Sequence, residues 1–237
     1  MKEIHFTEID STNLYLKKHY AELDDLDIVD AKHQSAGRGR MARVWEDSSG
    51  ENLLFSVLIK DKNLFPEFSS LSLLAASSIM NTIKSLGING VSVKWPNDVM
   101  VNDKKICGIL LESVSFGSEI EALIIGIGLN VNQNEFDELP HATSIYIEAK
   151  KGYEIGAFSE LVYTNIRNDI LMFKMGDRSY LENIRNANYL TCQYVDFVYN
   201  DENKHGYVKG IDDDNKLIID VEGTELHLSS GEVSFHK

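Results

Sequence analysis

A short stretch of alternating glycine and arginine has the composition of an anion-binding loop: Gly37-Arg38-Gly39-Arg40. Glycine lets successive backbone N–H groups converge on an anion, and arginine adds a planar, permanently charged fork that matches phosphate or carboxylate. Arg43 adds a further cation nearby, in a chain whose formal net charge is −14. A solvated basic surface loop has a similar composition, but the strand patterns on both sides and the nearby Trp45 argue against a tail.

A second polar cluster ends a predicted strand: Lys94-Trp95-Pro96-Asn97-Asp98. Proline fixes its own φ and keeps the preceding residue out of helical geometry, so the strand must stop here. A cation, an aromatic ring, an amide and a carboxylate then share one strand end, where ligands often bind in α/β sheets. By itself, the stretch is better explained as a strand-terminating turn with capping Asn97 and Asp98.

Glycines interrupt two apolar strand patterns. Gly108 follows Lys105, and Gly126 and Gly128 break the apolar run before Asn130. A glycine inside a strand marks a place where a ligand or another backbone approaches closely, and glycines two residues apart face the same side. A Gly-x-Gly pair alone is weak evidence, because it lacks the third glycine and the helix start of a dinucleotide-binding site. Asn130 either reads an adenine edge or caps a turn.

Near the N-terminus, Ser11-Thr12-Asn13 precedes a short helical pattern that runs towards Tyr20. These residue types are preferred helix N-caps, so capping explains them first. Their hydroxyl and amide groups could also bind a polar ligand head, and the two roles are compatible. Cys107 lies in an apolar run, where a buried inert thiol is a better interpretation than a nucleophile.

Composition and charge exclude several classes of protein. The chain has 237 residues, 43% of them hydrophobic, which permits one large domain or a main domain with a small one. The charge of −14 gives no general attraction to nucleic acid, so we expect no DNA binding. No apolar run is long enough to span a bilayer, and the acidic N-terminus is no signal peptide. We therefore expect a cytoplasmic protein without membrane association. The two cysteines form neither a disulfide framework nor a zinc site.

The periodicity predicts an α+β fold in which a mixed sheet carries helices. Helical spacing predicts helices over 69–86 and 158–175, and apolar runs predict strands over 27–32, 52–59, 91–94 and 121–129, with a hairpin over 99–112. After about residue 188 only short alternating runs remain, over 193–199, 205–211, 216–221 and 225–228. Such runs are typical of a small β-barrel or sandwich. We therefore predict a main domain over 1–186 and a β-module over 187–237.

Taken together, these stretches resemble the catalytic core of biotin protein ligases. The matching segments are Asp10-Ser11-Thr12-Asn13, Gln34 with Gly37-Arg38-Gly39-Arg40 and Trp45, Lys94-Trp95-Pro96-Asn97-Asp98, Lys104 to Glu112, Gly126 to Asn132, Ala142-Thr143-Ser144-Ile145 and Gly231-Glu232-Val233-Ser234. They occur in the family's order and cover nearly the whole chain. The resemblance implies a class II synthetase-like ligase core followed by an SH3-like β-domain. It also implies a two-step reaction, in which biotin and MgATP form biotinyl-5′-AMP and a lysine of a biotin carboxyl carrier protein then attacks it.

The resemblance also implies roles for individual residues. Biotin would be bound by Ser11, Thr12, Asn13, Gln34, Gly37, Arg38, Gly39, Arg40, Lys105, Gly108, Gly126 and Gly128. ATP would be bound by Arg38, Arg40, Arg43, Trp45, Lys105 and Asn130. The catalytic set would be Arg40, Lys105, Asp98 and Lys94, with Asp98 placing magnesium or the attacking lysine. The reaction joins two anions, and the cations Arg38, Arg40, Lys94 and Lys105 would lower the repulsion between them. Because ATP activates the acid, no cysteine or serine nucleophile is required.

Two features depart from the family's pattern. The family loop usually continues Arg-Gly-Arg, whereas this chain has Met41-Ala42-Arg43, which removes one positive charge. Only ten residues precede Ser11, so the DNA-binding repressor domain that some members carry is expected to be absent. A lipoate or octanoate ligase of the same fold is the alternative function, and a catalytically inactive binding module is another. The resemblance also allows a homodimer through sheet edges.

Overall fold

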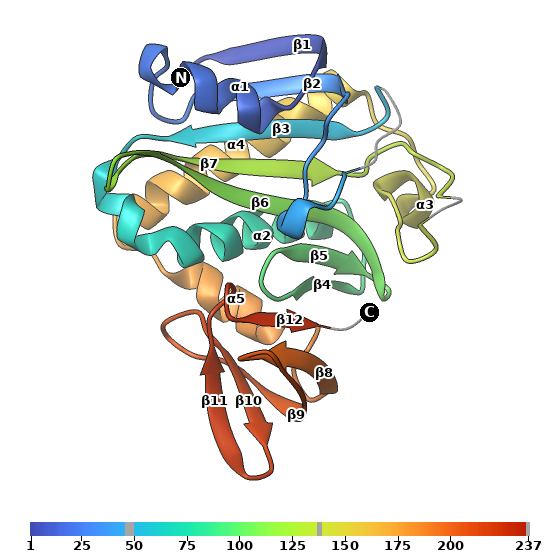
Figure 1. Cartoon of the computed structure of the whole chain (residues 1–237). Coiled ribbons are helices and arrows are strands. Elements are labelled where there is room, and N and C mark those ends of the chain that lie inside the picture. The colour runs from blue at the N-terminus through green and yellow to red at the C-terminus, as the bar shows by residue number, and fades with distance from the viewer. Residues whose placement is uncertain (46–49, 137–138, 236–237) are drawn as a thin grey trace.

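A seven-stranded mixed sheet forms the centre of the computed structural model, which describes residues 1–45, 50–136 and 139–235 (Figure 1). The strand order is β1-β2-β3-β7-β6-β5-β4, with β1 parallel to β2 and every other neighbouring pair antiparallel. The strands are β1 Glu3–Ile9, β2 Ile28–Gln34, β3 Leu53–Ile59, β4 Val91–Lys94, β5 Asp98–Val101, β6 Lys104–Phe116 and β7 Glu119–Leu129. The predicted hairpin is β5–β6, and β6 extends four residues further than expected, to Phe116.

Helices cover the sheet unequally on its two faces. The helices are α1 Thr12–His19, α2 Phe68–Ser85, α3 Ile145–Ala149, α4 Ile155–Lys174 and α5 Ser179–Asn186, with short 3-10 turns at Tyr20–Glu22, Arg40–Ala42 and Lys62–Glu67. Figure 1 shows α2 and α4 running together behind the sheet. The predicted helices α2 and α4 are confirmed to within three residues at each end. The short helices α3 and α5 are additions to the predicted elements.

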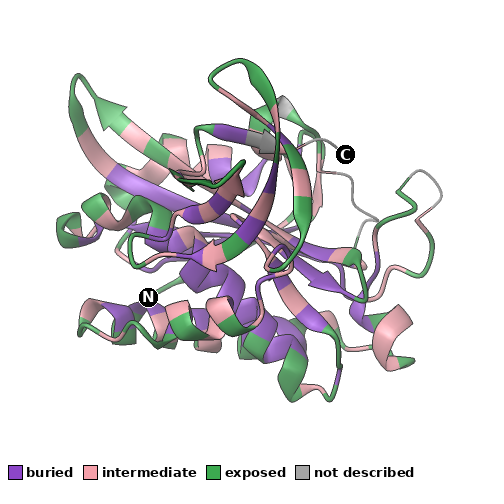
Figure 2. Cartoon of the chain, turned by 90° about the horizontal axis from the view of Figure 1, so that it is seen from below, coloured by how far each residue is buried: buried purple, intermediate pink, exposed green. Residues whose placement is uncertain are grey.

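Alternation along the strands decides which residues reach which face. In β3, Phe55 and Val57 join the large hydrophobic cluster that includes α2 and α4, whereas Leu58 joins a smaller cluster with Leu16 of α1. In β7, Ile124 likewise belongs to the α1 side. Because successive strand side chains point to opposite faces, the glycines that follow Ile124 at even positions also face the α1 side. Figure 2 shows the buried residues concentrated in the sheet and on the inner sides of the helices.

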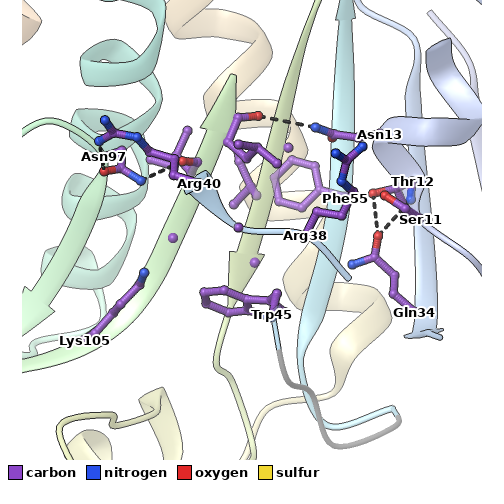
Figure 3. A pocket seen from close by; sticks show the side chains of 17 residues that line it. Ser11, Thr12, Asn13, Gln34, Arg38, Arg40, Trp45, Phe55, Asn97 and Lys105 are labelled. Carbon is purple, nitrogen blue, oxygen red and sulfur yellow. Dashed lines mark hydrogen bonds between the residues drawn. The ribbon is translucent and has the colours of Figure 1, made fainter. Parts of the chain in front are cut away.

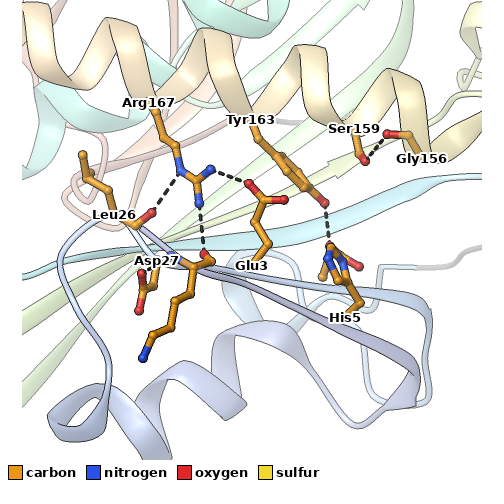
Figure 4. A network of polar contacts seen from close by, with 10 residues as sticks. Glu3, His5, Leu26, Asp27, Gly156, Ser159, Tyr163 and Arg167 are labelled. Carbon is orange, nitrogen blue, oxygen red and sulfur yellow. Dashed lines mark hydrogen bonds and ion pairs between the residues drawn. The ribbon is translucent and has the colours of Figure 1, made fainter.

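Strand β1 is an edge strand that the sequence patterns did not predict. Polar and apolar residues alternate from Glu3 to Thr7, and a polar network ties the strand to α4 on the far face (Figure 4). The Arg167 guanidinium pairs with Glu3 and donates to the carbonyl oxygens of Lys2, at 3.0 Å, and Leu26, at 3.2 Å. The Tyr163 hydroxyl donates to the Asp30 carboxylate at 2.9 Å. The tertiary contacts of α4 therefore hold a strand that has little apolar surface of its own.

The C-terminal segment forms a second, antiparallel sheet with the order β11-β10-β9-β8-β12. Its strands are β8 Tyr194–Tyr199, β9 Glu202–Ile211, β10 Leu217–Val221, β11 Thr224–Leu228 and β12 Val233–Phe235. The four alternating runs predicted here are confirmed, and β12 is an addition. Within the described residues no ladder joins β11 to β12, so the expected barrel is an open five-stranded sheet.

One asparagine fastens this second sheet to the core. Asn215, in the β9–β10 turn, accepts a hydrogen bond from the Tyr180 hydroxyl at 2.8 Å and donates to Ser70 at 3.0 Å. Its carbonyl oxygen accepts from the Trp95 indole at 3.0 Å. One hydrophobic cluster runs through both parts, and the division at residues 186 and 187 stays a prediction. No described helix combines the length and the apolar character needed to cross a membrane.

Candidate active site

The main pocket lies on the α1 side of the central sheet, where β3, β7 and β6 run side by side. The empty space amounts to about 480 Å³, part of it open to solvent. Its walls are Ser11, Thr12, Asn13, Gln34, Arg38, Gly39, Arg40, Trp45, Phe55, Asn97, Lys105, Gly108, Ile109, Leu110, Gly126, Ile127 and Gly128 (Figure 3). No aspartate or glutamate belongs to this set among the described residues, so the lining is cationic in a strongly acidic protein.

Glycines make the floor of the pocket. Gly108 of β6 pairs with Gly128 of β7, and the Trp45 ring lies directly over both. A Cβ atom would approach the ring within 2.7 Å at Gly108 and within 2.4 Å at Gly128, distances that real Cβ atoms do not adopt. At Gly126 a Cβ would come within 2.3 Å of the Asn13 side-chain oxygen. These three glycines are therefore required by close approach of side chains from other elements.

The Gly/Arg stretch folds back on itself as a small hairpin that carries Trp45 onto this floor. An antiparallel bridge joins Arg38 to Val44, and the Gly39 N–H donates to the Arg43 carbonyl at 2.7 Å. At the tip, Met41 has the left-handed backbone conformation, with φ of 54°, and two thirds of it is exposed. A residue with a Cβ atom adopts this conformation at a cost of about 1 kcal/mol. The departure from the family's Arg-Gly therefore falls at the turn itself.

Arg40 reaches from the hairpin across to two other parts of the chain. Its guanidinium donates to the Asn97 side-chain oxygen at 2.9 Å and to the Ser230 backbone carbonyl, in the C-terminal segment, at 2.7 Å. Burial lowers the pKa of Arg40, while the neighbouring Asp98 carboxylate raises it. Arginine stays charged in proteins, so the group remains a fixed cation at the pocket wall.

Lys105 supplies a second cation, on β6. Its ammonium lies 2.8 Å from the Asp98 carboxylate and 5.4 Å from the centroid of the Trp45 ring. An ammonium over an aromatic face is attracted by the ring, by about 0.5–1 kcal/mol when exposed. Lys105 therefore lies between the Trp45 ring and the Asp98 carboxylate, which neutralises its charge.

The opposite end of the pocket is built from neutral, buried polar groups. The Gln34 side-chain oxygen accepts from the Thr12 N–H at 2.8 Å, and the Thr12 hydroxyl lies 2.7 Å from the Ser56 hydroxyl. Ser56 donates to the Asn13 oxygen at 2.5 Å. The Asn13 amide nitrogen donates to Glu112 at 2.8 Å. Ser11 precedes helix α1 without a side-chain capping bond, and it lines the pocket together with Thr12. Of the two roles considered for the Ser11 hydroxyl, capping is therefore not observed.

Five of the residues expected to bind ligand lie outside the lining. Gly37 supports the hairpin, because a Cβ there would come within 2.6 Å of the Trp45 carbonyl oxygen. The Arg43 side chain is exposed, and Asp98 stands behind Lys105. Lys94 lies over the Tyr189 ring, 5.9 Å from its centroid. Asn130 is buried and its amide donates to the Thr143 carbonyl at 3.0 Å, which holds the turn before α3. The four predicted groups at the end of β4 therefore separate, and the buried Trp95 belongs to the core.

Sequence reasoning missed several residues of the site. The lining includes Phe55, Asn97, Ile109, Leu110 and Ile127, which were not among the expected site residues. Ser56 and Glu112 lie behind it and hold its polar groups. Only the turn motif around Asn97 carried a signal, since an apolar strand residue gives no indication of which face it lines. Burial raises the pKa of the Cys107 thiol far above its ordinary value, which agrees with an inert thiol.

The arrangement suits an elongated ligand with a neutral polar head and an anionic end. Fixed donors and acceptors surround the buried end, where the Arg38 guanidinium also lies, 3.8 Å from Glu112 (Figure 3). Arg40 and Lys105 lie at the other end. Cations placed around two anions lower the repulsion between them, and a pocket that excludes water makes this effect larger. Joining a carboxylate to a phosphate is chemistry of this kind.

Comparison with known proteins identifies the class to which this architecture belongs. The model of the biotin/lipoate A/B protein ligase family matches residues 5–130, a range that contains the whole pocket lining. The chain belongs to this family. It is 28% identical over 229 residues to the bifunctional ligase/repressor BirA of Escherichia coli, covering 95% of this chain and 71% of that protein. It is 26% identical over 230 residues to the biotin–[acetyl-CoA-carboxylase] ligase of Mycobacterium tuberculosis, covering 94% and 85%.

Among solved structures, the chain is similar to biotin protein ligase from Aquifex aeolicus in complex with biotin and ATP. The TM-score is 0.88 at 27% sequence identity, and the match covers 100% of this chain and 99% of that one. The similarity therefore includes the C-terminal sheet as well as the main sheet.

Proposed function

We propose that this protein is a biotin protein ligase, which activates biotin with ATP and transfers it to a lysine of a biotin carboxyl carrier protein. The observation that carries the proposal is the pocket itself, with a buried neutral end, a glycine floor and a cationic end on one continuous surface. Biotin has a neutral cyclic urea at one end and a carboxylate at the other. The named relatives are biotin ligases, and the solved Aquifex aeolicus relative holds biotin and ATP.

The buried end of the pocket would receive the urea ring. A urea offers one carbonyl acceptor and two N–H donors, so its partner must present both kinds of group. Gln34, Thr12 and Ser11 supply an amide and hydroxyls there. A pocket for the plain alkyl chain of lipoate or octanoate has no need of such a set, and unpaired buried polar groups would weaken its binding.

In the first step, a carboxylate oxygen of biotin attacks the α-phosphorus of ATP. The bond from that phosphorus to the bridging oxygen breaks, and pyrophosphate leaves with the bonding electrons. Lys105 would leave Asp98 and bind the reacting carboxylate, while Arg40 would bind the phosphates. Arg38 would have to turn from Glu112, 3.8 Å away, to join it. The contacts that support this are the position of Lys105 over the floor and the fixed cation at Arg40. The Trp45 indole N–H, buried without a partner among the described residues, offers a further donor to the ligand.

In the second step, the neutral amine of the carrier lysine attacks the acyl carbon, and AMP leaves. The amine loses a proton, and Asp98 is the carboxylate nearest to Lys105 that could orient it. Trp45 covers the glycine floor, so water is kept from the mixed anhydride. We assign Lys94 only to the rim of the site, because it lies against Tyr189.

Magnesium would enter with the nucleotide. In the described part of the chain, no three His, Cys, Asp or Glu side chains are grouped to hold a metal ion. Asp98 offers one carboxylate, already paired with Lys105. Magnesium in nucleotide sites is usually held by one or two carboxylates and by substrate phosphates, so the donors present fit MgATP as substrate. Asp98 is the protein ligand that we propose for it.

Pyrophosphate–ATP exchange tests the proposal directly. The purified protein is incubated with ATP and labelled pyrophosphate, and biotin, lipoate or neither is added. We expect exchange with biotin alone. Exchange driven by lipoate and not by biotin would replace this proposal with the lipoate function, and absence of exchange with either would support a binding module without activity.

We further propose that the enzyme works in the cytoplasm. We also propose that it does not bind DNA, because its net charge of −14 repels the phosphate backbone of DNA. A homodimer through sheet edges stays a prediction, and β1 and β4 are the two edges of the main sheet. Sedimentation with and without biotin and ATP would measure the oligomeric state.

A further inference from the structure

A chain of buried hydrogen bonds runs behind the head end of the pocket, from Glu112 to Gln34. The links are Glu112 to Asn13 at 2.8 Å, Asn13 to Ser56 at 2.5 Å, Ser56 to Thr12 at 2.7 Å and Thr12 N–H to Gln34 at 2.8 Å. Asn13, Ser56 and Thr12 are each less than 5% exposed. Water therefore has little access to these three residues, and their groups must satisfy one another.

The identity of the groups fixes the direction of every bond in this chain. A carboxylate only accepts, so Asn13 must turn its NH₂ to Glu112 and its oxygen to Ser56. Ser56 then donates its single proton to Asn13 and must accept from the Thr12 hydroxyl. Thr12 has no proton left for Gln34, although its hydroxyl lies 3.1 Å from the Gln34 oxygen. The Gln34 oxygen is held by the Thr12 backbone N–H instead.

The direction starts at Glu112 because this carboxylate is kept ionised. Lys17 donates to its other oxygen at 2.6 Å, and the Arg38 guanidinium lies 3.8 Å from the same atom. Burial acts to raise the pKa of Glu112, but the hydrogen bonds from Lys17 and Asn13 outweigh burial and keep that pKa below its usual value. Lys17 matters for a second reason. It is a pure donor, so it requires an acceptor atom at this position whatever residue stands there.

We propose that Glu112 is a specificity-determining positioning residue, which sets the hydrogen-bond polarity of the pocket's head end through Asn13, Ser56 and Thr12. The Thr12 backbone N–H holds the Gln34 oxygen in either polarity, so the Gln34 NH₂ group is turned away from Thr12 (Figure 3). With this polarity the Thr12 hydroxyl gives its proton to Ser56, so the Gln34 oxygen keeps one lone pair free. A ligand carbonyl would accept from the Gln34 NH₂ group, and a ligand N–H could donate to that free lone pair. The inference rests on the proposed function, because it takes the head group to be the urea of biotin.

Replacing Glu112 by glutamine changes one carboxylate oxygen into an NH₂ group. This reverses the direction of the side-chain hydrogen bonds from residue 112 to Thr12. Lys17 would bind the oxygen of the new amide, so the NH₂ of that amide would face Asn13 and force the Asn13 amide to flip. Ser56 would then donate to Thr12, and Thr12 to the Gln34 oxygen, which would have no lone pair left for a ligand N–H. Removing the Lys17 ammonium as well allows the new amide to turn its oxygen back to Asn13, which restores the original direction. A second substitution should therefore rescue the first.

The experiment titrates biotin, without ATP, into the wild type, E112Q, K17M and the double variant by calorimetry. We expect E112Q to bind biotin at least about tenfold more weakly, the scale of one lost hydrogen bond to a buried group. K17M and the double variant should stay within about threefold of the wild type. A double variant as weak as E112Q, or an E112Q equal to the wild type, would overturn the proposal. If E112Q does not fold, a double variant that folds and binds biotin within about threefold of the wild type supports the proposal, because the amide is then tolerated once Lys17 is removed. A weaker double variant overturns it.

The double variant also separates polarity from general damage, because E112Q and the double variant carry the same amide at position 112 and differ only in the Lys17 ammonium. A wild type that binds no biotin would instead refute the proposed function, so the two failures are distinguishable.

Discussion

The two ends of the pocket are built in opposite ways. At the head end, Thr12 and Asn13 are 3% and 4% exposed, and each is hydrogen-bonded to other buried groups. At the loop end, Met41 and Val44 are 66% and 73% exposed, and the hairpin between them is closed by few backbone bonds. The difference follows from what each end must recognise. A neutral ring is read by dipoles of fixed direction, which need a rigid surrounding, whereas an anion is attracted from any direction by charges on an adaptable loop.

The glycines of the floor lie between the two ends, and each end uses a different glycine of β7. Gly126 makes room for Asn13 of the head end, and Gly128, two residues further along β7, makes room for Trp45 of the loop end. One strand therefore supports both kinds of recognition. This division allows each end to be damaged separately.

The largest effect is expected from Lys105→Met, which removes the cation between the two ends. Without it the carboxylate and phosphate repel one another, and removing one such preorganised group typically lowers kcat by about 10²–10³-fold. Biotin-dependent pyrophosphate exchange measures the loss. Lys104→Met is the matched control, because Lys104 is an exposed neighbour on the same strand and does not line the pocket. A similar loss in both variants would remove Lys105 from its role.

The pair Gly126→Ala and Gly128→Ala should break one end each. The added Cβ at position 126 would collide with Asn13, and the one at position 128 with Trp45. Overpacking of this kind costs about 1–3 kcal/mol, so we expect biotin affinity to fall by roughly ten- to a hundredfold in the first variant. In the second variant, retention of the adenylate should suffer more than biotin affinity. Calorimetry with biotin and filter binding of labelled adenylate measure the two properties, and identical profiles would contradict the division.

A smaller effect, on the loop end alone, is expected from Arg40→Ala. The guanidinium should act on phosphate, so release of the adenylate should become about tenfold faster while biotin binds within about twofold of the wild type. Arg43→Ala, an exposed arginine of the same hairpin outside the lining, is the control. Equal losses of biotin and adenylate affinity in Arg40→Ala would assign Arg40 to both ends.

The smallest effect is expected from Met41→Arg at the tip of the hairpin. The change restores one positive charge at an exposed position, where screening limits it to about a few tenths of a kcal/mol. The KM for pyrophosphate in the reverse reaction should fall by about twofold, and biotin affinity should not change. A strengthening of biotin binding would show that the two ends are coupled through the loop.

How much of this could be predicted from the sequence depends on the kind of feature. Helices α2 and α4 and the strands β3 and β7 could be predicted because their apolar residues recur at a fixed period. Strand β1 and helix α5 could not, because contacts with distant residues hold them in place. Glycine inside the β7 strand correctly indicated close approach, but the sequence did not say by what.

The ordered set of motifs determined by itself the family of this protein and most residues of its pocket, since a chain of this length matches such a set by chance only rarely. The tertiary structure alone decided which of these residues line the pocket and which of them pack in the core. It placed Asn97 in the pocket and Trp95 in the core, although both belong to one turn. It also brought Ser56 and Glu112 behind the head end, from strands far apart in the sequence. The physical reason is that the direction of a hydrogen bond depends on which partner the fold brings within about 3 Å, and no local pattern records that partner.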